Sequence, residues 1–184
     1  MDLEAEILKE HSKRNIERIA DWIGSDKRRF RELMNLLLEG EPVVTQRSAW
    51  ILTSCYERYP ALIKPWLSSI LVKMQEPGVH DAVKRNVVRM LQCADIPRPL
   101  QGRIVSLCYE YLEAVDAPVA VKANAMGVLV RLAESEPALR GELRATIEHM
   151  MPYVGAALRA RGRMVLKRLT RFERPRENRR ELRP

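Results

Sequence analysis

The sequence predicts an all-α protein, an α-α superhelix (solenoid) of about four stacked helix pairs preceded by an N-terminal helix. Apolar residues recur at helical spacing through most of the chain, as in residues 121–134, where they form one stripe. Short turns containing Pro, Gly or Asp separate these stretches. A repeat of about 38 residues is the third observation. Aromatic residues make up only 5% of the chain and no stretch alternates with period two, so no strand is expected.

The first two helices are predicted over residues 3–24 and 27–39. The first carries an apolar stripe that includes Ile16 and Ile19, and its pattern allows one break. Gly24 ends it, and Asp26 provides an N-cap for the second helix, which Gly40 ends.

Seven further helices follow, joined by short links. They are predicted over residues 42–58, 60–74, 80–93, 100–114, 121–134, 135–151 and 155–172. The turns between them contain proline, glycine or aspartate, as in Glu76-Pro77-Gly78. Asp81 stands in the first turn of its helix, where a carboxylate suits the helix dipole.

The repeat is visible in the spacing of core residues. Small or apolar residues predicted to face the core are Ala49, Val87, Ala125 and Gly162, at intervals of 38, 38 and 37 residues. The next core layer, Leu52, Met90, Val128 and Val165, has the same intervals. In the partner helices Leu62, Leu100 and Leu139 are separated by 38 and 39 residues. Periods of this size indicate stacked helix pairs, in which each repeat completes its core with its neighbours.

Two segments show the pattern within a repeat: DAPVAVKANA at residues 116–125 and DAVKRNV at residues 81–87. An acidic turn residue precedes Val-Lys, and a small or apolar residue follows. This pattern resembles HEAT repeats, and the resemblance covers about residues 26–172. In that family the acidic and basic residues often bond between neighbouring repeats, which implies such a role for Asp116 with Lys122 and for Asp81 with Lys84. The first copy departs from the pattern because it has Gln46 at the Lys122 position.

Charge is unevenly distributed along the chain. Residues 1–154 contain 21 basic and 21 acidic residues, whereas residues 155–184 contain 11 basic and three acidic ones. The net charge of +8 therefore belongs to the last 30 residues. We expect a single HEAT-like domain over residues 1–172 and a flexible basic tail over residues 173–184, whose composition cannot form a core.

The sequence predicts no catalytic, cofactor or metal-ligating residues. The three histidines are far apart, the three cysteines lack CxxC spacing, and no phosphate-binding glycine motif occurs. No apolar run is long enough to span a membrane, and the N-terminus lacks an apolar signal core. We therefore expect a cytoplasmic protein in a reducing compartment.

A protein partner is predicted to bind along the second helices of the repeats. With Ala49 in the core, helical geometry turns outward Arg47, Trp50 and Ile51, then Arg85 and Arg89 in the next copy, then Met126, Gly127 and Val130. Arg47, Trp50, Arg85 and Arg89 combine an aromatic ring with cations, a composition enriched at interaction surfaces. The other interpretation is that Trp50 is a core residue, and its solvent exposure distinguishes the two. The resemblance to HEAT repeats implies a non-catalytic scaffold or adaptor.

The alternative function is nucleic-acid binding through the C-terminal basic segment. Arg159, Arg163, Lys167 and Arg171 form a row at four-residue spacing, which an anionic partner would neutralise. The competing interpretation is a solvated cap on the terminal repeat. HEAT-like repeats also form a family of DNA glycosylases for alkylated bases, which implies an Asp near aromatic residues. No acidic residue is predicted beside Trp50, so repair catalysis lacks its acid here.

Overall fold

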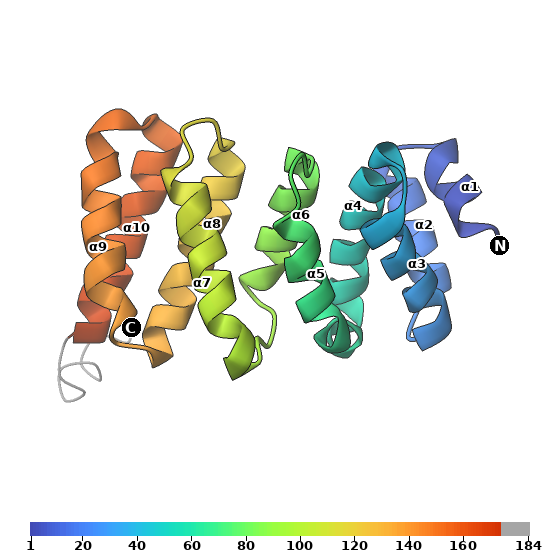
Figure 1. The fold of residues 1–184 in the computed structure, drawn as a ribbon, viewed down its shortest axis with the longest axis horizontal. Coiled ribbons are helices and arrows are strands. Elements are labelled where there is room, and N and C mark those ends of the chain that lie inside the picture. Colours follow the sequence, from blue (N-terminus) through green and yellow to red (C-terminus); the bar gives the residue numbers. More distant parts are fainter. Residues whose placement is uncertain (174–184) are drawn as a thin grey trace. The chain divides into compact units, whose positions relative to one another are not determined.

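The computed structural model describes residues 1–173. In this range it contains ten α-helices, three short 3-10 turns and no strand, so the predicted all-α, helical-repeat fold class is confirmed. The order of the helices can be followed by colour in Figure 1. Their bounds are α1 Leu3–Lys9, α2 Lys13–Ile23, α3 Lys27–Glu39, α4 Pro42–Arg58, α5 Leu67–Met74, α6 Asp81–Leu91, α7 Arg98–Glu113, α8 Val119–Ser135, α9 Leu139–Met150 and α10 Ala156–Glu173.

The predicted break in the first helix falls at residues 10–12. The Ser12 side chain accepts a hydrogen bond from the Asn15 backbone N–H at 3.2 Å and so caps α2. The Asn15 side-chain amide donates to the carbonyl oxygens of Glu6 at 2.9 Å and Glu10 at 3.0 Å. Asn15, a buried residue of α2, therefore provides hydrogen-bond donors for two carbonyl groups at the C-terminal end of α1.

The segment over residues 60–74 is not one helix as predicted. It forms two 3-10 turns, η1 (Pro60–Leu62) and η2 (Lys64–Trp66), before α5 begins at Leu67. Pro65 lacks an N–H and its ring would clash with the carbonyl of a preceding helical turn, so a regular α-helix cannot run through it.

The chain divides into two compact units, Met1–Leu107 and Cys108–Pro184, and the division falls inside α7. In the first unit α4 packs against α2 on one side and α6 on the other, and α1 also packs against α4. The α3 helix packs against α4 and α5. The core of this unit contains Ile19, Leu33, Leu52 and Leu67, none of which is exposed to solvent.

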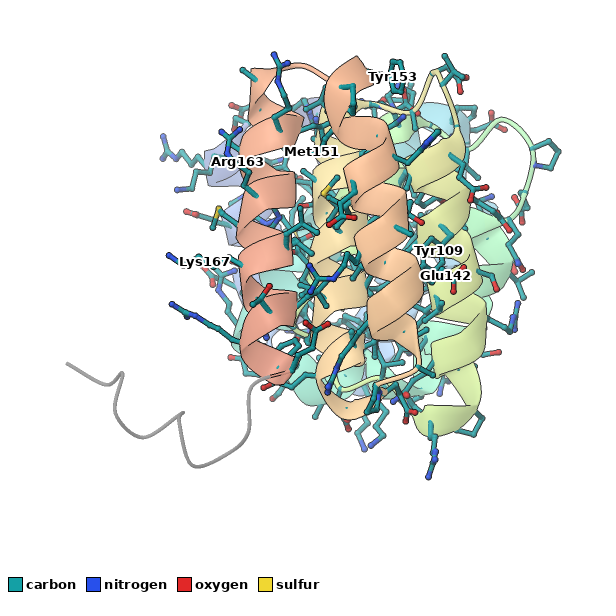
Figure 2. All side chains as sticks on the ribbon, turned by 90° about the vertical axis from the view of Figure 1, so that its left-hand side faces the viewer. Tyr109, Glu142, Met151, Tyr153, Arg163 and Lys167 are labelled. Atoms are coloured by element: carbon teal, nitrogen blue, oxygen red, sulfur yellow. The ribbon has the colours of Figure 1, made fainter. Side chains whose placement is uncertain are left out.

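In the second unit α8, α9 and α10 pack against one another. Gly162 of α10 is buried at this junction, and a Cβ atom there would lie 2.8 Å from the Met151 sulfur and 3.1 Å from Ile147 Cγ2. Met151 is labelled beside α10 in Figure 2. The helices therefore approach too closely for a side chain at this position.

The predicted repeat of core residues is confirmed for the second helices, whose eight core positions from Ala49 to Val165 are buried. The three positions predicted in the partner helices, Leu62, Leu100 and Leu139, are only half-buried. Asp81 and Lys84 form an ion pair at 3.6 Å. Both residues belong to α6, so the pair lies within one helix and not, as the resemblance implied, between neighbouring repeats. Of the predicted tail, Glu173 is the last residue of α10 and residues 174–184 lie outside the described range.

Part of the predicted outward face is wrong. Ile51, Met126 and Val130 are 0%, 0% and 3% exposed, and Gly127 is also buried. The α4 helix lies between α2 and α6, so it buries residues on more than one face. In α8 ten residues are buried, which is typical of a helix enclosed by its surroundings.

Candidate functional site

A pocket of about 270 Å³ opens between α4 and α6 in the first unit. Its lining, which we call the Trp50 pocket, consists of His11, Gln46, Trp50, Ala82, Arg85, Asn86 and Arg89. The α4 helix supplies one wall from two positions a turn apart, and α6 supplies the other wall from positions spaced by three or four residues. The link between α1 and α2 contributes His11.

Trp50 is half-buried in this pocket. The His11 ring stands edge-on to the indole, with ring centroids 5.2 Å apart and an interplanar angle of 72°. This arrangement holds the indole in one orientation and leaves part of it accessible. The interpretation of Trp50 as an entirely enclosed core residue does not fit this exposure.

Arg85 and Arg89 lie one turn apart on α6, and both are exposed. The Arg89 guanidinium is 3.3 Å from the Glu57 carboxylate, and more than half of each side chain remains exposed, at 62% and 57%. An exposed pair of this kind contributes little stability and exchanges readily for another anion. The seven lining residues of the Trp50 pocket include no carboxylate. The pocket therefore offers positive charge beside an aromatic face.

Arg47 has a different position from the other three predicted residues. Its guanidinium donates to the carbonyl oxygens of Ile7 at 3.0 Å and Leu8 at 2.8 Å, near the C-terminal end of α1. These carbonyls lack partners within the helix, so Arg47 caps α1 against α4. The structure thus gathers Trp50, Arg85 and Arg89 in one pocket and places Arg47 outside its lining.

The sequence interpretation missed other lining residues. Gln46 stands four residues before Trp50, and Ala82 and Asn86 share the α6 face with Arg85 and Arg89, so helical spacing could have identified them. His11 had no such signal because it reaches the pocket from a link distant in sequence from α4.

A second hollow of about 270 Å³ adjoins the Trp50 pocket at Arg89, which lines both. Its lining includes Tyr56 and Glu57 of α4 together with Met90 and the exposed Cys93. The accessible surface between α4 and α6 therefore extends past Arg89 toward the C-terminal ends of both helices.

The predicted basic row lies on α10 of the second unit. Arg159, Arg163, Lys167 and Arg171 are all exposed, and none forms an ion pair with another residue in the range 1–173. Figure 2 shows Arg163 and Lys167 projecting from the same side of α10. Two other α10 arginines are engaged: Arg161 donates to the Ala123 carbonyl at 3.2 Å, and Arg168 pairs with Glu134 at 3.0 Å.

Other reactive groups are enclosed by the core. Burial raises the pKa of the Cys55 and Cys108 thiols to about 12, so both are neutral at physiological pH. Burial also raises the pKa of Tyr109, and the neighbouring Glu142 carboxylate adds to this effect. Figure 2 shows the Tyr109 and Glu142 side chains close together. Within residues 1–173 no three His, Cys, Asp or Glu side chains gather to hold a metal ion.

No helix in the described part of the chain is both long and apolar enough to cross a bilayer. The family model for HEAT repeat domains matches residues 3–169, from the first residue of α1 into α10. Among curated proteins and among solved structures, none matches the chain. Because the family match covers most of the sequence and agrees with the buried repeat positions, the chain belongs to the HEAT repeat family.

Proposed function

We propose that this protein is a non-catalytic HEAT-repeat scaffold that binds a protein partner at the Trp50 pocket. The observation that carries the proposal is the gathering of Trp50, Arg85 and Arg89 around one pocket without a carboxylate. Stacked helical repeats commonly use the exposed faces of their helices as binding surfaces. Tryptophan and arginine are also the residues most enriched where interface energy concentrates.

The lining indicates what the partner contributes. An indole held by His11 accepts an apolar or planar side chain at low entropic cost. Arg85 and Arg89 attract a carboxylate, which would replace Glu57 as the anion beside Arg89. We therefore propose a partner segment that combines an Asp or Glu with an aromatic or aliphatic side chain.

The proposed location is the cytoplasm. The chain has three cysteines, and none forms a disulfide. Cys93 is exposed and two others are buried, a state that a reducing compartment preserves.

Affinity capture with the intact chain tests the proposal. We expect Trp50→Ala and the double variant Arg85→Glu, Arg89→Glu to lose the same partner. Matched controls are Arg98→Glu, an exposed arginine of the same unit, and Trp22→Ala, a half-buried tryptophan outside the pocket. Recovery of identical proteins by the pocket variants and by the intact chain would reject the pocket as the binding site. Arg47 is left unchanged, because its loss would release α1.

A second candidate function, phosphate binding by α10, is supported by the four cations of its basic row, which pair with no acidic residue among residues 1–173. A row of like charges at four-residue spacing repels itself, and phosphates of a nucleic acid would relieve that repulsion. Repair catalysis has less support, because the lining of the Trp50 pocket lacks a carboxylate.

Mobility-shift assays with duplex DNA and RNA at two salt concentrations test this second function. Replacing Arg159, Arg163, Lys167 and Arg171 by Gln should weaken binding and lower the salt slope of log K by about 3 to 4. The matched control is Arg168→Gln, because Arg168 is already paired with Glu134. Unchanged binding by the fourfold variant would reject the row as a phosphate site.

A further inference from the structure

A groove of about 490 Å³ lies between α3 and the segment of η1, η2 and α5 in the first unit. We call it the outer groove. Its apolar part is formed by Phe30, Leu62, Pro65 and Trp66. Lys27 and Arg31 add two cations from α3. It shares no residue with the Trp50 pocket, so the two surfaces can be tested separately.

The shape of the outer groove follows from the interrupted segment. Pro60 and Pro65 divide it into two 3-10 turns, so no straight helix packs along α3 over these residues. Leu62 and Trp66 remain half-buried, while Phe30 is only 2% exposed and forms the floor. A half-buried indole beside a closed apolar floor can accept a bulky side chain.

The charges at the groove are unfavourable for the protein alone. Lys27 and Arg31 lie one turn apart on α3, both exposed, and neither makes an ion pair with another described residue. Like charges at this spacing repel. Both lie in the first two turns of α3, and Lys27 directly follows the N-cap Asp26, where the helix dipole disfavours cations. An anionic occupant would therefore relieve two unfavourable interactions.

We infer that the outer groove binds an acidic protein segment that inserts a bulky apolar side chain against Trp66. Its carboxylates would lie beside Lys27 and Arg31, and the apolar side chain would rest on Phe30 and Leu62. Two cations around an apolar floor suit a short peptide better than a nucleic acid, which needs a longer row of phosphate contacts. Phe30 is buried and Leu62 and Trp66 are half-buried, so these large side chains do not project as a membrane-inserting surface would.

Fluorescence anisotropy with the full chain tests this inference. The probe is a fluorescein-labelled peptide with a central Phe-Leu pair flanked by Glu residues. We expect Lys27→Glu with Arg31→Glu, and separately Trp66→Ala, to weaken binding about tenfold or more. Glutamate suits the start of a helix, so the charge variant should keep its fold, which circular dichroism verifies.

All variants are compared in the Arg85→Glu, Arg89→Glu background, so that the peptide cannot occupy the Trp50 pocket. The matched controls are Arg28→Glu and Trp22→Ala, a half-buried tryptophan that does not line the groove. Arg28 is exposed on α3 next to Lys27 but does not line the groove. Both controls should bind the peptide as the Arg85→Glu, Arg89→Glu background does. Equal weakening by Arg28→Glu would show a nonspecific charge effect and overturn the site. Equal binding of a peptide with Ser in place of Phe-Leu would contradict the inference that an apolar side chain inserts against Trp66. Binding only to duplex DNA or to anionic vesicles, and not to the peptide, would contradict the inference that the groove binds a protein segment.

Discussion

The α4 and α10 helices are copies of one repeat unit with different surfaces. Ala49 of α4 and Gly162 of α10 occupy the same core position, and both are buried. The next residue is Trp50 in α4, half-buried against His11, and Arg163 in α10, which is exposed. The α4 helix packs between α2 and α6, whereas among the described helices α10 packs against α8 and α9. The repeat therefore fixes the core, and the neighbouring helices determine how the remaining positions are used.

Core truncation should produce the largest difference between these helices. Leu52→Ala in α4 should cost about 2–5 kcal/mol of unfolding free energy, because Leu52 is fully enclosed and leaves a cavity. Leu169→Ala in α10 should fall at the lower end of that range, because a helix with fewer neighbours relaxes more easily. Urea denaturation followed by circular dichroism measures both. All three tryptophans lie in the first unit, so their fluorescence should report Leu52→Ala more directly. A larger cost for Leu169→Ala would contradict the comparison.

Filling the close contact in α10 should have the next largest effect. Gly162→Leu should destabilise the protein by about 1–3 kcal/mol, since the new side chain meets Met151 and Ile147. The control is Gly141→Ala in α9, where an added Cβ meets nothing within 4 Å. That change should stabilise by about 0.5–1 kcal/mol through helix propensity. Thermal unfolding of both variants checks the opposite signs, and a stabilised Gly162→Leu would disprove the close packing.

Alkaline pH should weaken the core around the buried thiols. The pKa of Cys55 is raised from 9.0 to about 12 in the folded chain, so the unfolded chain loses this proton first. Its contribution to stability is complete below pH 9 and declines as the pH rises toward 12, by about 1.4 kcal/mol per pH unit. Cys108 behaves in the same way in the second unit.

Urea titrations between pH 8 and pH 10 test this dependence. Cys55→Ala should reduce the slope of stability against pH, whatever its effect on stability at pH 8. Cys93→Ala serves as the control because Cys93 is exposed. An identical slope for Cys55→Ala and the intact chain would show that the Cys55 thiol ionises freely in the folded state.

Reversing surface charges should change the free energy of unfolding least, with opposite signs on the α10 row and at the Trp50 pocket. Lys167→Glu should stabilise by about 0.2–0.5 kcal/mol for each neighbour, Arg163 and Arg171, because repulsion becomes attraction. Arg89→Glu should destabilise by a similar amount, because Glu57 then faces a like charge. Chemical denaturation at low salt measures both. Destabilisation by Lys167→Glu would mean that the α10 row has partners that relieve its charge.

Most of the fold could be predicted because its signals are local. The bounds of α3 and α4 follow from caps, proline and glycine, and the repeat follows from spacing. The predicted outward position of Ile51 failed because one buried stripe was assumed for a helix that has neighbours on both sides. The pocket was predicted only in part. His11 and the role of Arg47 depend on where α1 packs, and residue spacing contains no signal for that contact.

Site-specific photocrosslinking tests the central claim that a protein partner occupies the Trp50 pocket. A photoreactive amino acid would replace Gln46 on one wall or Ala82 on the other, and Asn35, exposed on α3, would serve as the control position. We predict that both wall positions capture the same protein, that Asn35 does not, and that Arg85→Glu with Arg89→Glu abolishes the product. Capture at Asn35 alone, or an undiminished product with the double variant, would contradict the account.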